Sequence, residues 1–100
     1  MVDALGIIET LGYTAAIQAA DAAVKSANVK LGNWVKVGGG RVCIILRGDV
    51  AAVKAAVESG SQAAKSIGTV VSELVIARPS EKLVMKFPID PIKPEKKSAK

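Results

Sequence analysis

The order of apolar and polar positions divides the first 80 residues into six segments. Four segments are short and apolar, as β-strands are, while two longer alanine-rich runs repeat apolar residues at helical spacing. Strands are expected at residues 2–9, 29–37, 41–47 and 69–78, and helices at residues 15–27 and 50–65. The predicted order is therefore β-α-β-β-α-β.

The first predicted helix has a very small inner face. Its apolar face is predicted to comprise Ala16, Ala19, Ala20, Ala23, Val24 and Ala27. Thr14 is expected to cap this helix, and Asp21 and Lys25 are spaced to form an ion pair on its polar side. A face of alanines allows the helix to lie close to a sheet.

The second helix has clearer limits. Asp49 is placed to cap its first turn, and Gly60 is a weak point within it. Pro79 closes the last strand, a short helix is expected at residues 80–86, and Pro88, Pro91 and Pro94 prevent regular structure beyond it. We expect one domain over residues 1–80, followed over residues 81–100 by the short helix and a flexible Pro/Lys-rich tail.

This order of elements predicts an α+β fold of the ferredoxin-like type. Such a fold has an antiparallel four-stranded sheet with two helices on one face. The opposite face must then be polar or covered by another segment.

Three consecutive glycines, Gly38 to Gly40, separate the second and third predicted strands in the stretch KVGGGRV. Glycine is favoured where φ is positive or where another group approaches the backbone closely. The triplet therefore marks either a sharp corner or a place where another group meets bare peptide, and between two predicted strands it indicates a β-hairpin.

Charge and composition exclude several functions. The net charge is +5, but residues 92–100 carry four Lys and one Glu, so the rest of the chain is nearly neutral. With no His and only Cys43, which we expect to be a buried apolar side chain in its strand, neither a metal site nor a cofactor is predicted. Few aromatics argue against nucleic-acid binding, and no apolar run is long enough to span a membrane. We expect a soluble cytoplasmic protein that is not an enzyme.

The glycines do not match known phosphate-binding loops, because they precede a strand where such loops precede a helix. An alternative function stays open at this point. The chain could be a small ferredoxin-like ligand- or anion-binding regulatory domain, and the short GGRV string suggests, more remotely, an acylphosphatase-like enzyme.

Several longer motifs carry a resemblance to a known family. These are residues 4–31 (ALGIIETLGYTAAIQAADAAVKSANVKL), then VKVGGGRV, then residues 47–60 (RGDVAAVKAAVESG) and residues 75–79 (VIARP). In this order they resemble the single-domain shell proteins of bacterial microcompartments, which carry one BMC domain. Ser80 stands where the family usually has histidine, and Arg41 occupies a position that is more often apolar.

The resemblance implies a structural role. It implies a homohexamer that tiles with neighbouring hexamers and other shell paralogues into the shell of a cytoplasmic bacterial microcompartment, with encapsulated enzymes as further partners. A central pore for small polar metabolites would be lined by Lys36, Val37, Gly38, Gly39 and Gly40. The edges between hexamers would use Lys25, Asn28 and Arg78.

Overall fold

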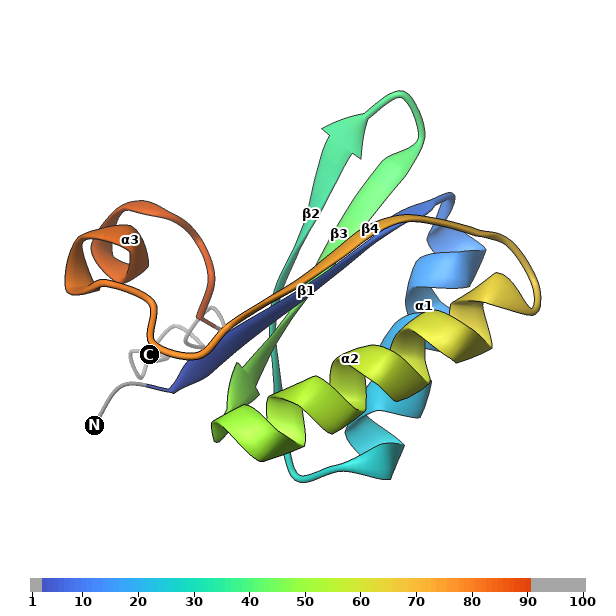
Figure 1. The fold of residues 1–100 in the computed structure, drawn as a ribbon. Helices are drawn as coiled ribbons and strands as arrows, with labels where there is room; N and C mark the ends of the chain where they lie inside the picture. The colour runs from blue at the N-terminus through green and yellow to red at the C-terminus, as the bar shows by residue number, and fades with distance from the viewer. Residues whose placement is uncertain (1–2, 91–100) are drawn as a thin grey trace, which may run out of the picture.

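The structure, a computed structural model, describes residues 3–90. Seven elements follow one another in this part of the chain (Figure 1). They are β1 (Ala4–Leu11), α1 (Tyr13–Ser26), β2 (Lys30–Gly38), β3 (Arg41–Gly48), α2 (Val50–Lys65), β4 (Thr69–Ile76) and α3 (Glu81–Lys86).

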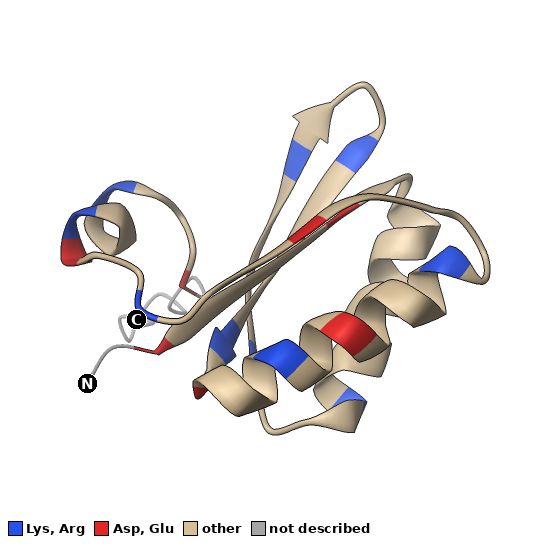
Figure 2. Cartoon of the chain, viewed as in Figure 1, with Lys and Arg blue, Asp and Glu red and all other residues tan. Residues whose placement is uncertain are grey.

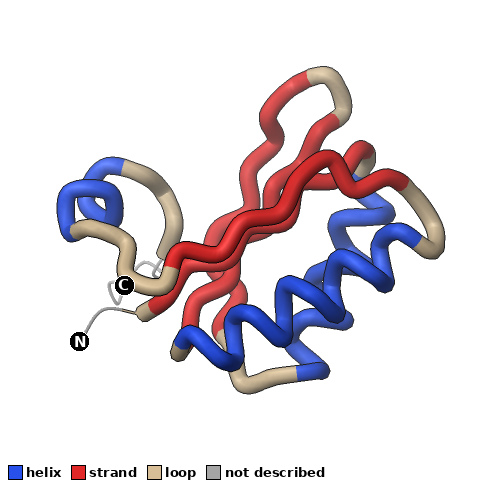
Figure 3. Tube along the Cα trace, in the orientation of Figure 1, coloured by secondary structure: helices blue, strands red, loops and turns tan. Residues whose placement is uncertain are grey.

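The four strands form one antiparallel sheet in the order β2-β3-β1-β4. Helices α1 and α2 cover one face of this sheet, and the short helix α3 lies on the other side (Figure 3). The ferredoxin-like α+β prediction is confirmed. Strands β2 and β4, which are far apart in the sheet, form its two edges.

The strand registers define two opposite ends of the sheet. At one end, Arg41 pairs with both Gly38 and Leu11, and Leu11 pairs with Thr69. At the other end, Lys30, Arg47, Leu5 and Ile76 are paired in succession across all four strands. The glycine turn therefore lies at one end of the sheet, and the ends of α1 and β4 lie at the other.

The core between the sheet and the helices depends on small side chains. Its buried members on α1 are alanines, Ala15, Ala16, Ala19 and Ala23. Gly60 of α2 is buried against α1, where an added Cβ would lie 2.7 Å from the carbonyl oxygen of Ala19. Rather than weakening α2 alone, this glycine allows the two helices to approach closely.

Several predicted boundaries and one predicted cap differ from the structure. Helix α1 begins at Tyr13, so Thr14 is inside it and the prediction that Thr14 caps the helix is wrong. Gly12, with φ of 96°, takes the capping position without a side-chain hydrogen bond. Strand β1 lies two residues later than expected, and β4 ends at Ile76. Val24, assigned to the inner face of α1, is 39% exposed.

The predicted cap of the second helix is confirmed. The Asp49 side chain accepts a hydrogen bond from the Ala52 backbone N–H at 3.0 Å. Ser80 caps α3 in the same way, through the N–H of Leu83 at 3.1 Å. Both caps satisfy a backbone donor that a helix leaves unpaired in its first turn.

The second face of the sheet is covered near one end by the C-terminal part of the described chain. Ile89 is only 4% exposed and packs in a small cluster with Leu5 and Ile45, against which Leu83 and Val84 of α3 also pack. We refer to Phe87–Asp90 as the C-terminal strap. Packed structure therefore continues ten residues past the expected domain boundary at residue 80, while the predicted tail over residues 91–100 lies outside the described residues.

Cys43 lies on this second face, and not in the core beneath the helices. Its neighbours Val42 and Ile44 point into the helix-side core, so alternation along β3 turns Cys43 the other way. It is partly exposed and pairs in register with Glu9 of β1. The side chain was predicted to be buried, and in the structure it is buried only in part.

Candidate functional site

The glycine turn connects β2 and β3 through a backbone conformation that requires glycine. Gly38, Gly39 and Gly40 have φ values of 110°, 63° and 81°. Positive φ at both central residues, Gly39 and Gly40, is typical of two-residue hairpin turns. An added Cβ at Gly38 or Gly39 would meet nothing within 4 Å. In a single copy, therefore, the glycines are needed for backbone geometry and not to avoid a clash.

The turn is fixed to the start of α1. The N–H of Gly12 donates to the carbonyl oxygen of Gly40 at 2.6 Å, and Thr10 Oγ1 donates to the Gly12 carbonyl at 3.1 Å. Two positive-φ segments thus support each other at this end of the sheet. The turn is exposed yet held at its base.

All five residues predicted to line a pore are exposed, and they are consecutive at this turn. Basic positions lie on both strands of the hairpin near its turn (Figure 2). Lys36 pairs in register with the core residue Val42, so it extends from the helix side of the hairpin. Arg41, adjacent to Val42, starts from the opposite side. The two cations therefore flank the turn from different faces.

An open hollow of about 510 Å³ lies beside the turn on the helix side. Tyr13 and Trp34 meet edge to face across it, with ring centroids 5.7 Å apart and planes at 60°. The hollow is lined by Gly12, Tyr13, Trp34, Lys36, Gly38, Gly40, Arg41 and Val42. A narrower apolar groove shares Tyr13, Trp34 and Val42 and continues between α1 and β2 past Ile17 and Leu31.

Apolar side chains are exposed along both edges of the molecule. On the α1–β2 edge, Tyr13, Ile17, Leu31 and Trp34 are between 43% and 55% exposed. On the β4 edge, Ile67, Val71 and Leu74 are 54%, 43% and 50% exposed. On the α1–β2 edge these side chains line one groove, and an exposed apolar surface of this kind usually marks an interaction site. The two edges carry different residues on different elements, so neither resembles the other.

The three residues predicted to form edges between hexamers lie at the end of the sheet opposite the glycine turn. Lys25 and Asn28 are at and just after the end of α1, and Arg78 follows β4. All three are exposed. Lys25 Nζ contacts Asp21 Oδ2 at 2.9 Å, as an i, i+4 pair. A pair this exposed contributes little to stability, so Lys25 is available for other contacts.

Among the described residues, the Cys43 thiol is the group whose pKa is clearly shifted by its surroundings, and Glu9 of β1 lies beside it. Partial burial, followed by the nearby Glu9 carboxylate, raises the pKa of the Cys43 thiol. Glu9 Oε1 also accepts a hydrogen bond from Ser72 Oγ at 3.0 Å. Because the thiol stays protonated near neutral pH, Cys43 is a poor nucleophile.

No chemistry-bearing cluster accompanies these features in the described part of the chain. Residues 3–90 contain no group of three or more His, Cys, Asp or Glu side chains that could hold a metal ion. Over the same residues, no helix has the length and apolar character needed to cross a membrane. What the described surfaces offer is contact area and exposed backbone.

The sequence reasoning missed the apolar edges and the strap. For α1, a signal was present, since Tyr13, Ile17, Ala20 and Val24 repeat at helical spacing and form a second apolar stripe beside the alanine face. The strap gave no local signal. Its contacts join Asn33 with Pro88 and Arg47 with Asp90, across 55 and 43 residues.

Comparisons with known proteins agree with these observations. The family model described as the BMC domain matches residues 4–79. The bacterial microcompartment shell protein PduA of Citrobacter freundii is 57% identical over 77 residues, which cover 77% of this chain and 83% of PduA. The carboxysome shell protein CcmK2 of Synechococcus elongatus is 50% identical over 88 residues, covering 86% of each chain.

Two further matches extend this set. The bacterial microcompartment shell protein EutM of Escherichia coli K12 is 52% identical over 87 residues, covering 87% of this chain and 90% of EutM. A crystal structure of a microcompartment protein from Desulfitobacterium hafniense superposes with a TM-score of 0.78 at 38% identity. That match covers 85% of this chain, which spans 48% of the length of the Desulfitobacterium protein.

Proposed function

The chain belongs to the BMC domain family of bacterial microcompartment shell proteins, and from this premise we propose how its surfaces build a shell. It is a structural subunit and not an enzyme, as its relatives are shell proteins. We propose that it forms a cyclic homohexamer in the shell of a cytoplasmic microcompartment. The glycine turns would surround a central pore, and the lysine-bearing ends would join neighbouring hexamers and other shell paralogues.

The observation that carries the ring proposal is the pair of unlike apolar edges. A two-fold dimer buries the same patch on both copies, whereas contact between two different patches is head to tail and forms a ring when the rotation between successive copies closes. The groove between α1 and β2 suits side chains such as Ile67 and Val71 of a next copy. Burial of these side chains would supply the stability that the alanine-rich core lacks.

The geometry of the glycine turn supports the pore. The turn lies at the end of the sheet away from Lys25 and Arg78, so a ring with Lys25 at its rim would bring six turns to its centre. At the centre, the absence of Cβ atoms would leave an opening and expose backbone N–H groups.

The same turn supports a preference among solutes. Backbone N–H donors replace part of the water that a polar solute loses on entry, as in other selective pores. Lys36 and Arg41 flank the turn from opposite faces, so six copies would place a basic ring near each mouth. We therefore propose that small polar and anionic metabolites pass more readily than apolar ones.

Sedimentation with negative-stain imaging tests the ring. Wild-type protein should sediment near six times 10.3 kDa and form tiled sheets on concentration. Ile17→Asp should give folded single copies, because it places a charge on the apolar α1–β2 edge. Gln18→Asp, at the neighbouring exposed position, should still form rings.

Single copies of the wild type at high concentration would overturn the ring, as would unchanged rings of Ile17→Asp. A low-order oligomer that binds an anion stoichiometrically would instead favour the regulatory-domain alternative. Circular dichroism should show whether each variant is folded.

The pore is tested separately at Gly39. Asparagine tolerates positive φ better than other side chains, so Gly39→Asn should keep the turn while filling the opening. Flux of a small carboxylate is measured across assembled sheets on a porous support. Flux through Gly39→Asn sheets should fall well below flux through Gly39→Ala sheets, because Gly39→Ala introduces turn strain but adds only one methyl group. Equal flux through both variants would contradict the pore.

A further inference from the structure

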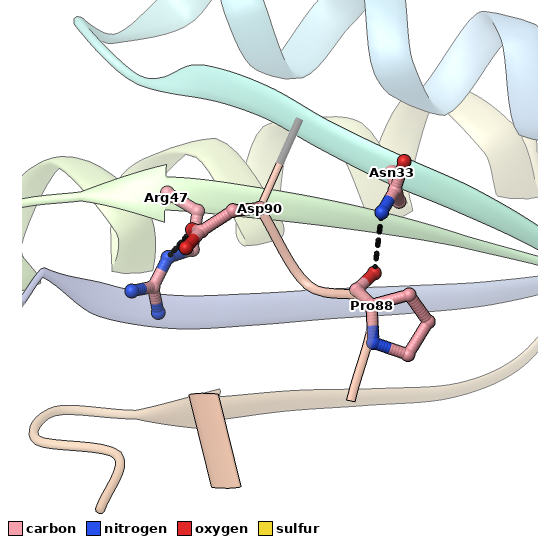
Figure 4. A network of polar contacts seen from close by, with 4 residues as sticks. All are labelled: Asn33, Arg47, Pro88 and Asp90. Atoms are coloured by element: carbon pink, nitrogen blue, oxygen red, sulfur yellow. Dashed lines mark hydrogen bonds and ion pairs between the residues drawn. The ribbon is translucent and has the colours of Figure 1, made fainter. Parts of the chain in front are cut away.

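The C-terminal strap makes three different contacts through three consecutive residues, and Figure 4 shows the two that are hydrogen bonds. The Pro88 carbonyl oxygen accepts a hydrogen bond from Asn33 Nδ2 at 2.9 Å. Ile89 is buried with Leu5 and Ile45. Asp90 Oδ1 accepts from Arg47 Nε at 3.0 Å. The sheet face thus contacts a backbone carbonyl, a branched apolar side chain and a carboxylate on successive residues.

The surface beneath the strap lets its backbone approach the sheet closely. The β2–β3 register shifts between Leu31 and Trp34, next to both Gly32 and Asn33. A Cβ at position 32 would collide with the carbonyl oxygen of Ile89, so glycine is required for the strap to lie this close. We refer to the surface formed by Leu5, Gly32, Asn33, Ile45 and Arg47 as the seat.

Arg47 is only partly satisfied by the strap. Its side chain is 6% exposed, and its Nη1 is buried with no hydrogen-bond partner among the described residues. Asp90 remains 56% exposed and contacts the guanidinium through one oxygen. A buried guanidinium is bound best by a carboxylate that accepts from two of its nitrogens, and an unpaired buried donor is costly. The seat can therefore hold a carboxylate more fully than Asp90 does.

We propose that the seat is a peptide-recognition site that the chain's own strap occupies in cis. Its partner in trans is a short segment of another protein in which a branched aliphatic residue is followed by an acidic one. The tethered strap has an effective concentration on the order of millimolar, so a free segment competes only weakly while the strap is intact. The seat is on the sheet face away from α1 and α2, although Gly32 and Asn33 lie between Leu31 and Trp34 of the α1–β2 edge, and the strap occupies it in a single copy.

A synthetic peptide tests this proposal on the full chain. The probe is fluorescently labelled acetyl-Phe-Pro-Ile-Asp-Pro-amide, and binding is followed by anisotropy. A double variant, Ile89→Ala with Asp90→Asn, weakens the strap and should bind the probe at least tenfold more tightly than wild type. A probe with Asn in place of Asp should bind the double variant at least tenfold more weakly. Adding Arg47→Gln to the double variant should abolish binding of the probe.

Trypsin cleavage after Lys86 reports independently whether the strap has been released. If cleavage accelerates but the probe binds no better than to wild type, the seat is a packing contact only and the proposal is wrong. Equal binding of the Asp and Asn probes also overturns it. If the double variant unfolds, Asp90→Asn alone should bind the Asp probe severalfold more tightly than wild type does. Equal affinity of Asp90→Asn and wild type would refute the site. Sedimentation of the same samples reports the ring separately.

Discussion

At the scale of single residues, Gly60 and the turn glycines are required for different reasons. The turn glycines adopt positive φ in open space, whereas Gly60 is an ordinary helical residue that leaves room for a neighbouring helix. The sequence shows both as glycine but does not separate the two reasons. Only the position of α1 against α2 distinguishes them.

Gly60→Ala should therefore destabilise the protein, although alanine is normally the better helix former by about 1 kcal/mol. The new Cβ would lie 2.7 Å from the Ala19 carbonyl oxygen and 2.8 Å from Ile8 Cδ1. Overpacking of this kind costs about 1–3 kcal/mol. Urea unfolding at fixed protein concentration measures the change, and Gln62→Ala, at an exposed position of α2, serves as the control. A stabilised Gly60→Ala variant would contradict the close helix contact.

Cys43 makes stability depend on pH in the alkaline range. The folded state favours the protonated thiol, so the free energy of unfolding should fall as pH rises above the ordinary thiol pKa, between about pH 8 and 10. Cys43→Ser should remove this part of the pH dependence. Glu9→Gln should lower the thiol pKa and speed alkylation by iodoacetamide at pH 8.5. An unchanged alkylation rate would show that the Glu9 carboxylate has no influence on the thiol.

At the scale of elements, the predictions succeeded where a signal is local. Helix α2 was predicted with the observed limits because Asp49 and the apolar period occur within the element itself. The start of α1 was missed because Gly12 takes the capping position at positive φ, held by a hydrogen bond to Gly40 that joins residues far apart in the sequence. Cys43 was predicted only to be buried, because alternation along a strand does not say which face the helices cover.

The cap at Asp49 gives a prediction at this scale. Asp49→Ala removes the acceptor for the Ala52 N–H and should lower the free energy of unfolding by about 1 kcal/mol. Asp21→Ala, which removes only an exposed ion pair with Lys25, should cost a few tenths of a kcal/mol at most. Urea unfolding of both variants gives the comparison. Equal losses would mean that the cap adds nothing beyond a surface charge.

At the scale of the whole molecule, the pore and edge residues were predicted only through the resemblance. Nothing in the residues around Lys25 separates an edge lysine from an ordinary surface lysine, and its side chain is 74% exposed. The apolar edges exist only once α1, β2 and β4 are assembled. The strap is held by residues that lie up to half the sequence away. The prolines predict only the end of regular structure, so the packing of Ile89 was not predicted.

Lys25→Ala should leave rings intact and prevent extended sheets. The lysine stem can pack along a neighbouring ring while its ammonium donates to acceptors across the junction, and alanine supplies neither contact. Negative-stain imaging of concentrated samples measures sheet extent, and sedimentation measures the ring. Lys54→Ala, at an exposed position of α2, is the matched control. Sheets of normal extent from Lys25→Ala would refute the assignment of this end as the junction.

The positive φ values at residues 38–40 would restrict how the permeability of the proposed pore could be engineered. Most side chains placed at these positions would strain the hairpin as well as alter the opening, so folding and filtering would change together. Lys36, Val37 and Arg41 are exposed and free of that restriction. Charge and width could be adjusted there, one position at a time, with the backbone left as it is.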